Sequence, residues 1–525
     1  MRKFLLVLLF LLAGCGVTVE DRTASTLPRN SLGLYDLVVR VERASGGVGI
    51  SSVNAVTSYG TFSMAPAGGL DWTAQIPLGV CVNGFDVRYD AKWSYLLAGN
   101  TRRDPRAGVR QKWLTGPPPQ GCPTQFGLLF IVDSTADLPD LAPGDGVCSA
   151  AGNVCTLRAA VMEANANRGQ DRIELDAGTY VLTREGEEDA AATGDLDILD
   201  EVVIAGTGAT AISAGETGER VFDVAPSGER VDLELRLLDV VDGRAVEGAG
   251  IRNRGHLQLF RVVVRDNRAE YAGGGILNDN GFVELRDSEL RDNQVTGNPA
   301  ALGGGILSRG ASAGIVIRAS SVIGNESSQH GGGILIIEGR FEIRDSTIAD
   351  NRSGVHGAGL FANGEVYAKV RNVTVTGNVA DSDHTGAGNG GGIHRGGPGP
   401  GTFQMANSIV AQNQAVTGDD CNGTISGDGH NFLGTADGCV GPGATDIAGT
   451  DLSPQDPRLG PLSGGTTRSR RPLTDSPVID AGNPDGENDE RTDRCTHVDQ
   501  RGTERPNGPS ADGRARCDIG SVERD

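Results

Sequence analysis

The chain has 525 residues and a formal net charge of −21, so we expect no nucleic-acid partner held by bulk charge. Glycine supplies 79 residues, about twice its usual share of roughly 7%, whereas aromatic residues make up only 4% of the chain. This composition predicts many turns and small repeated layers, and it argues against a large aromatic-lined pocket. The length allows several domains.

The N-terminus has the pattern of an export signal. Arg2 and Lys3 precede an apolar run over residues 4–13, which is too short to span a bilayer and fits a signal peptide. Residues 12–15, Leu-Ala-Gly-Cys, resemble the bacterial lipobox. The resemblance implies a signal peptide over 1–14, lipidation of Cys15 and a polar tether over 15–30. We therefore expect an exported protein anchored by lipid to the outer membrane, on its periplasmic or cell-surface side. The alternative is a simple secretory signal.

The cysteine content agrees with export. Apart from Cys15 the chain has eight cysteines, and an even number in an exported protein indicates disulfides. They fall into four local pairs, which predicts the bridges Cys81–Cys122, Cys148–Cys155, Cys421–Cys439 and Cys495–Cys517. A metal site is the competing interpretation, but no Cys-x-x-Cys motif occurs.

Residues 31–126 differ in composition from the rest and predict a small β-sandwich domain. They contain all three tryptophans, and residues 35–42 and 84–93 alternate between apolar and polar types as strands do. A run of three prolines at 117–119 marks the end of this domain.

Residues 127–171 predict a cysteine-stapled loop followed by one short helix. Thr156 is a good N-cap, and an apolar stripe at helical spacing follows it. The segment resembles the CSLREAI-type domain of bacterial surface proteins, although Ala159 replaces the usual Glu. The matching residues are Cys155, Thr156, Leu157, Arg158, Ala160, Ala164 and Asn165. The resemblance implies an N-terminal cap on a β-helix and no enzymatic activity.

Residues 172–450 repeat a Gly-rich element and an asparagine at a period of 26 to 35 residues. A fixed period of this size indicates a solenoid, and the short β-rich pieces make it an all-β one. The pattern resembles the right-handed parallel β-helix of the pectin-lyase-like superfamily, with repeats like those of chlamydial polymorphic outer-membrane proteins. Residues 451–525 resemble the C-terminal cap and tail of such proteins, and we expect them to cover the last open coil. The repeated asparagines are Asn267, Asn293, Asn325, Asn351, Asn378 and Asn413.

We align the repeats on these asparagines and add Gly243 as a degenerate first copy. The columns eight and three residues before these positions are wholly apolar and must point inward. The column seven before, which points outward, is rich in arginine and reads Arg236, Phe260, Arg286, Arg318, Arg344, Arg371 and Ala406. One interpretation is a cationic stripe for an anionic polysaccharide. We favour the other, an outer face of Glu–Arg pairs, because Glu234, Glu284 and Glu342 lie two residues from an arginine.

The asparagine column and the residues just before it predict mainly a scaffold. Asparagine tolerates left-handed turns and can bond to neighbouring coils, so a stacked ladder is expected. The position before it includes Asp242, Asp266 and Asp292, a row that could hold Ca²⁺ or supply the acid and base of glycoside cleavage. Solvated turn carboxylates are the interpretation we favour.

Histidines and one acidic loop are the remaining candidates. His330 and His356 precede the Gly triplet of adjacent repeats, so they stack at one edge and are candidates for metal binding or proton transfer. His394 breaks an otherwise apolar column, which indicates loop divergence. Asp485 and Asp489 lie in an acidic stretch similar to a cation-binding loop, but without the glycine of an EF-hand.

We therefore favour a lipid-anchored, exported β-helix protein with a structural or adhesive role, no catalysis and no cofactor, Ca²⁺ being the alternative. Its expected partners are the membrane and carbohydrates or surface proteins. A polysaccharide lyase or glycoside hydrolase that uses Asp242, Asp266, Asp292, His330 and His356 stays open as an alternative. A third hypothesis is a carbohydrate-binding module in residues 31–126.

Overall fold

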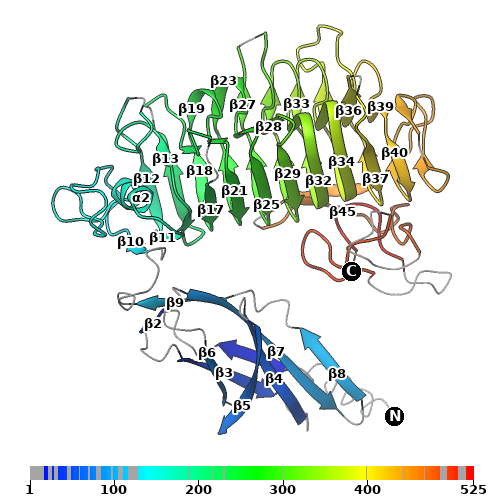
Figure 1. Cartoon of the computed structure of the whole chain (residues 1–525). Coiled ribbons are helices and arrows are strands. Elements are labelled where there is room, and N and C mark those ends of the chain that lie inside the picture. The colour runs from blue at the N-terminus through cyan, green and yellow to red at the C-terminus, as the bar shows by residue number, and fades with distance from the viewer. Residues whose placement is uncertain are drawn as a thin grey trace. The chain divides into compact units, whose positions relative to one another are not determined.

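The computed structural model describes two compact units, residues 1–127 and 128–525. It describes nine strands of the first unit between residues 17 and 115, and residues 128–524 except for 187, 216, 229–230, 298, 398, 442, 466, 485–492 and 507–515. The predicted fold class is confirmed, because an all-β unit precedes a parallel β-solenoid of about ten turns (Figure 1).

The first unit contains nine paired strands in the order β1-β3-β6-β5-β4-β7-β9-β2, with β8 beside β7. The first half of β5 pairs with β4 and its second half with β6, so β5 joins two groups of mainly antiparallel strands. The strands are β1 (Val17–Asp21), β2 (Thr26–Pro28), β3 (Leu34–Arg43), β4 (Gly49–Thr57), β5 (Gly60–Gly68), β6 (Asp71–Pro77), β7 (Gly84–Tyr95), β8 (Ala98–Arg103) and β9 (Arg110–Thr115).

Each complete coil of the solenoid has four faces, which we number in chain order from the face after the Gly triplet. The first face contains β13 (Leu196–Ile198), β16 (Phe222–Val224), β20 (Ile251–Asn253), β24 (Ile276–Asp279), β28 (Ile306–Arg309), β36 (Ile393–Gly396), β39 (Cys421–Thr424) and β42 (Cys439–Val440). The second contains β10 (Leu129–Ile131), β11 (Asp171–Glu174), β14 (Val202–Ala205), β17 (Asp232–Arg236), β21 (His256–Phe260), β25 (Phe282–Arg286), β29 (Gly314–Arg318), β37 (Phe403–Ala406) and β40 (Ser426–Gly429).

The third face contains β12 (Gly178–Val181), β15 (Thr210–Ser213), β18 (Asp239–Val241), β22 (Val263–Arg265), β26 (Glu289–Arg291), β30 (Ser321–Ile323), β38 (Ile409–Ala411), β41 (Phe432–Leu433) and β43 (Ile447–Ala448). Two long strands, β32 (Ile334–Ala349) and β34 (Leu360–Thr376), run through the first three faces. The fourth face is a separate sheet of β19 (Arg244–Glu247), β23 (Arg268–Ala272), β27 (Gln294–Val295), β31 (Glu326–Ser327), β33 (Arg352–Ser353) and β35 (Val379–Ala380).

The interior of the solenoid is a set of aliphatic stacks, as the repeat alignment predicts. On the second face Leu235, Leu259 and Leu285 lie in register and are at most 1% exposed. On the third face Val240, Val264 and Leu290 form a second buried stack. Burying each such side chain contributes about 1.5–3 kcal/mol, so repetition alone stabilises a long solenoid.

The Gly triplets and the asparagines contact each other across the coil. The first glycine of each triplet has a left-handed backbone, as at Gly273 with φ 61°. The third one abuts the asparagine of its own coil, because a Cβ on Gly275 would lie 3.0 Å from Asn293 Cγ. The two signature elements of the repeat are therefore one packing unit.

The single described helix, α2 (Leu157–Ala166), closes the N-terminal end of the solenoid (Figure 1). Thr156 caps it as predicted, accepting a hydrogen bond from the Ala159 N–H, and its apolar side chains join the solenoid core. The first solenoid strand, β10, precedes this helix in the chain. Among the described residues no helix has the length and apolarity that crossing a bilayer requires.

The C-terminal segment folds back along the outer side of the third face, beyond the last coils that we expected it to cover. It contains the hairpin β44 (Leu459–Ser463) and β45 (Ser469–Pro472). Arg468 pairs with Glu289 on β26, and Ser521 bonds to Thr374 on β34. We call residues 457–524 the C-terminal strap. It also packs Val478 and Ile519 against the late coils, beside Ile409 and Phe432.

Candidate functional sites

The asparagine column is a continuous hydrogen-bond ladder inside the solenoid. Each side-chain amide donates to the side-chain oxygen of the next asparagine, at 2.8 to 3.0 Å from Asn267 to Asn413. These side chains are at most 4% exposed. The ladder ends where Asn413 donates to the Asp420 carboxylate at 2.9 Å. The predicted scaffold role is confirmed.

The left-handed turn lies one residue earlier than the sequence interpretation placed it. The positive φ angles belong to Asp242, Asp266 and Asp292, at 61°, 58° and 56°, and not to the asparagines. The asparagine side chain needs an ordinary backbone to point inward, so the preceding residue makes the turn and is exposed. Aspartate and glycine suit this position because they tolerate the left-handed region.

Each carboxylate of this row has its own partner. Ser213 donates to Asp242 at 2.9 Å, Arg265 to Asp266 at 2.6 Å and Arg291 to Asp292 at 3.0 Å. The row begins the fourth face, whereas His330 and His356 come at its end. No described hydrogen bond or ion pair joins the two groups, so the geometry does not bring the five candidate catalytic residues to one point.

The arginine column carries the predicted outward Glu–Arg pairs. Arg236 lies 2.6 Å from Glu234, and Arg286 lies 3.2 Å from Glu284. Arg318 reaches Glu284 of the preceding coil at 3.5 Å and Glu342 of the next at 3.7 Å. Solvent-exposed pairs of this kind contribute about 0–1 kcal/mol each and neutralise most of the stripe.

His330 and His356 stack as predicted, and His394 joins them. The rings of His330 and His356 are parallel within 13°, with centroids 5.1 Å apart, and His394 lies 5.0 Å from His356 on the other side. Phe361 contacts all three rings. The expectation that His394 reflects loop divergence is wrong. It continues the outward column of Leu335 and Phe361 and is only 9% exposed. We call these four residues the histidine cluster.

Burial keeps the histidine cluster neutral. Loss of solvent, with a smaller contribution from the neighbouring imidazoles, lowers the pKa of His330 and of His394 to about 4. Burial also lowers the pKa of His356. The Nδ1 atoms of all three rings are buried without a hydrogen-bond partner. The cluster therefore offers neutral imidazoles in an apolar seam, the form that binds metal ions.

A buried acidic group near the N-terminal end was not anticipated from the sequence. Asp195, Asp197 and Asp223 have oxygens within 4.8 Å of one another and are at most 6% exposed. Arg220 lies 3.0 Å from Asp195 and 3.2 Å from Asp223, and Arg252 also pairs with Asp223.

The three carboxyl groups of this acidic group differ in their surroundings, and two of them have clearly raised pKa values. Burial raises the pKa of Asp197 to about 8, with a further increase from Asp195, and one of its oxygens has no partner. Burial raises the pKa of Asp195 to about 6, although Arg220 lowers it. Arg220 and Arg252 form ion pairs with Asp223. The group is therefore an ion-paired network in which Asp197 is the neutral acid at neutral pH.

Arg158, at the start of α2, is fully buried and holds several segments together. It pairs with Asp137 at 2.5 Å and donates to the backbone carbonyls of Ala191 and Gly194 at 2.9 and 2.8 Å. Asn165 donates to the Asp197 carbonyl at 2.8 Å and accepts from the Leu199 N–H at 2.8 Å. Arg158 and Asn165 thus fix the helix and the loop before β13 to the first coils.

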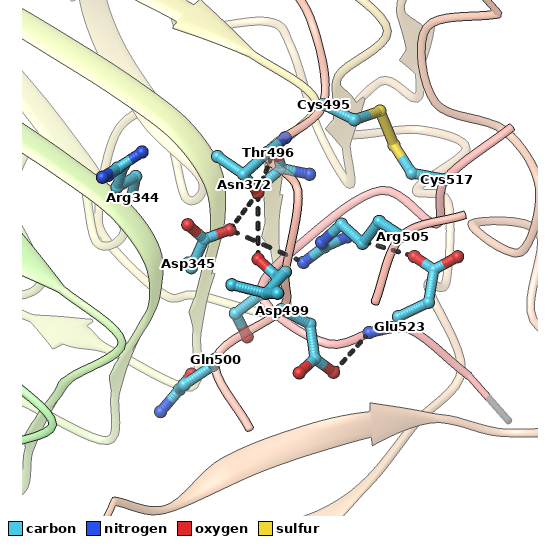
Figure 2. A network of polar contacts seen from close by, with 12 residues as sticks. Arg344, Asp345, Asn372, Cys495, Thr496, Asp499, Gln500, Arg505, Cys517 and Glu523 are labelled. Atoms are coloured by element: carbon cyan, nitrogen blue, oxygen red, sulfur yellow. Dashed lines mark hydrogen bonds and ion pairs between the residues drawn. A yellow bond between two sulfur atoms is a disulfide. The ribbon is translucent and has the colours of Figure 1, made fainter. Parts of the chain in front are cut away.

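The strap is held by a buried polar network (Figure 2). Arg505 is 1% exposed and lies between Asp345 of the solenoid, at 3.9 Å, and Glu523, at 3.3 Å. Thr496 donates to Asp345, and Arg344 projects away from the network. Burial raises the pKa of Asp345 to about 6, whereas Arg505 lowers it. No substrate can reach these groups, so the network is a docking contact.

Three of the four predicted disulfides are present: Cys148–Cys155, Cys421–Cys439 and Cys495–Cys517. The predicted Cys81–Cys122 bridge, Cys15, and the candidate cation ligands Asp485 and Asp489 lie outside the described residues.

Neither the comparison with protein-family models nor the comparison with curated proteins gives a match for this chain.

Proposed function

We propose that this chain is an exported, lipid-anchored surface protein whose solenoid serves a structural or binding role without catalysis. The proposal rests on one observation. The polar side chains of the repeat form their hydrogen bonds and ion pairs mainly with one another. The asparagines bond along the ladder, and the exposed aspartates and arginines pair locally. The repeat thus builds a long, stable face and leaves no convergent acid–base pair among the described candidates.

The lipid anchor rests on the lipobox-like residues before Cys15, and export is supported by the disulfides. The buried roles of Arg158 and Asn165 support a CSLREAI-type cap. The solenoid with an asparagine ladder is consistent with a pectin-lyase-like β-helix. Labelling with a palmitate analogue tests the anchor: label should enter the wild-type chain and not Cys15→Ser. Equal labelling would contradict the lipobox interpretation.

A glycan and surface-protein binding array tests the binding role of the full chain. We expect binding to a carbohydrate or surface protein that survives in an Asp266→Ala/Asp292→Ala double variant, because the exposed carboxylates are scaffold residues.

The second candidate function is cleavage of an acidic polysaccharide, which the row of exposed carboxylates favours. Release of reducing or unsaturated ends from polyuronates, lost in the same double variant, would establish the enzyme and overturn the non-catalytic proposal.

A further inference from the structure

The histidine cluster lies where two columns of side chains pack together outside the solenoid interior. The first column occupies the residue before each Gly triplet and runs Ala272, Leu302, His330, His356. The second is the outward column of the first face and runs Leu277, Leu307, Leu335, Phe361, His394. Both columns are aliphatic in the middle coils and then carry imidazole and aromatic side chains over the coils of His330, His356 and His394. Charged residues precede the aliphatic part, and Asn389, Thr417 and Asn422 follow the histidines.

Packing between the two columns does not require imidazole side chains. In the earlier coils Leu302 and Leu307 fill the same positions and form an apolar cluster with Ala272 and Leu277. The imidazoles instead bring three buried Nδ1 atoms that have no hydrogen-bond partner. A buried polar atom without a partner is destabilising, so a purely structural seam would be better served by leucine.

We propose that the histidine cluster binds a borderline transition-metal cation of the Cu²⁺, Ni²⁺ or Zn²⁺ class, with His356 as the central ligand and His330 or His394 as the second.

The three imidazoles lie near enough to one another for two of them to share an ion after their rings turn. Ring contacts join His356 to both neighbours, at centroid distances of 5.1 and 5.0 Å. Two nitrogens that each lie about 2.0–2.1 Å from one metal ion are at most about 4.2 Å apart. The rings of His330 and His356 are parallel within 13°, so both rings have to rotate about χ2, a broad torsion for histidine, before their nitrogens face one ion.

The surroundings suit such an ion. Phe361 packs against all three rings, and their buried Nδ1 atoms have no hydrogen-bond partner, so these nitrogens are available as ligands. His330 and His356 are half-buried, so an ion can enter and keep water ligands. Imidazole ligands suit Cu²⁺, Ni²⁺ and Zn²⁺, and Cu²⁺ should bind tightest of the three.

The test is a calorimetric titration of the purified full chain with CuCl₂, after chelator treatment and with a purification tag that lacks histidine. We expect one Cu²⁺ per chain and an electron paramagnetic resonance spectrum with nitrogen couplings. His356→Phe keeps an aromatic ring in the stack but removes both nitrogens. It should weaken binding by at least about tenfold with an unchanged circular dichroism spectrum.

The matched control is His256→Gln, because His256 lies on the second face beside Asp232, at 3.6 Å. Its dissociation constant should stay within about twofold of that of the wild type. Stoichiometric binding that His356→Phe leaves unchanged would overturn the proposal, and so would a wild-type chain that binds no Cu²⁺ beyond the level of the His330→Phe/His356→Phe/His394→Phe triple variant. The cleavage and array experiments do not depend on this result.

Discussion

The side-chain amide of Asn413 donates a hydrogen bond to the Asp420 carboxylate at 2.9 Å, and this contact ends the asparagine ladder. A carboxylate can only accept, so the direction of donation along the ladder has a defined end. The corner between the second and third faces ends in the same way, because Asn431 donates to Asp446 at 3.1 Å. At both positions an aspartate accepts the hydrogen bond of an asparagine side-chain amide.

Removal of the Asp420 carboxylate should destabilise the last coils of the solenoid. Asp420 accepts from the Asn413 N–H and side chain and from the Thr435 N–H, so Asp420→Ala leaves three buried donors unpaired. We expect a loss of at least about 3 kcal/mol. Hydrogen exchange should accelerate after residue 413 and stay unchanged in the early coils. Asp420→Asn retains one acceptor and should cost less, and equal effects of both variants would argue against the ladder-end role.

The contact between the Gly triplet and the asparagine predicts a strong position dependence of Gly→Ala substitutions. A Cβ on Gly333 would lie 2.7 Å from the Gly359 carbonyl oxygen and 3.0 Å from Asn351 Cγ. Gly333→Ala should therefore lower the free energy of unfolding by about 1–3 kcal/mol. The control Gly465→Ala meets nothing within 4 Å and should stay within about 0.5 kcal/mol in chemical denaturation. Equal free energies of unfolding for the two variants would contradict the proposed packing of the Gly triplet against the asparagine.

Arg505→Ala should release the strap while the solenoid stays folded. Arg505 donates to the Asp518 and Gly520 carbonyls at 3.0 and 2.9 Å as well as to Glu523, and losing a buried ionic partner costs about 3–5 kcal/mol. Limited proteolysis should then cut after residue 450 and leave a resistant core. Arg458→Ala removes an exposed pair with Asp475 and should leave the cleavage rate unchanged. If the solenoid core were digested at the same rate as the strap, the strap would not unfold independently of the solenoid.

Raising the pH from 6.5 to 8.5 should destabilise the solenoid. Burial raises the pKa of Asp171 and of Asp197 to about 8, far above the ordinary value of 3.8, so the folded chain binds protons there that the unfolded chain does not. Their contribution to stability is complete only below about pH 3.8, and it is lost progressively as the pH rises from there through 8. The lowered histidine pKa values act in the opposite direction, because the unfolded imidazoles still bind protons up to about pH 7.5, so the fall in stability is clearest between about pH 7.5 and 8.5.

Asp197→Asn isolates this contribution. It should flatten the fall of the free energy of unfolding with pH by up to about 1.4 kcal/mol per pH unit, because it removes one proton from the difference. Asp242→Asn, which changes an exposed carboxylate, is the control. Thermal unfolding at several pH values measures both, and a slope that Asp197→Asn does not alter would contradict a neutral Asp197.

The repeat period was sufficient to predict the solenoid and its ladder, because one register assigns every inward position at once. It predicted Leu285 and Leu290 as interior residues, Asn293 as a member of a stacked ladder and Arg286 as an outward partner of Glu284, and the structure confirms each. It misplaced the left-handed turn by one residue, since composition alone does not tell Asp292 from Asn293 as the residue that makes it.

Contacts without a period escaped prediction. The strap pairs Arg505 with Asp345, two residues 160 positions apart in non-repeating and repeating parts of the chain. The acidic group of Asp195, Asp197 and Asp223 lies in early coils where the repeat signature is degenerate. His394 was set aside because only the folded turn brings it next to His356, which belongs to a different column.

The strap also sets where the solenoid can gain or lose repeats during evolution. It contacts Glu289, Thr347, Thr374 and Ile409, so its anchor points are spaced by the coils between β26 and β38. A coil inserted or deleted there would shift these contact points by one coil. Arg468 would then lose its ion pair with Glu289, or Arg505 its ion pair with Asp345. Coils before β26 carry no strap contact among those described, so duplication there lengthens the protein without disturbing its closure. Repeat number should therefore vary among homologues on the N-terminal side and stay constant beneath the strap.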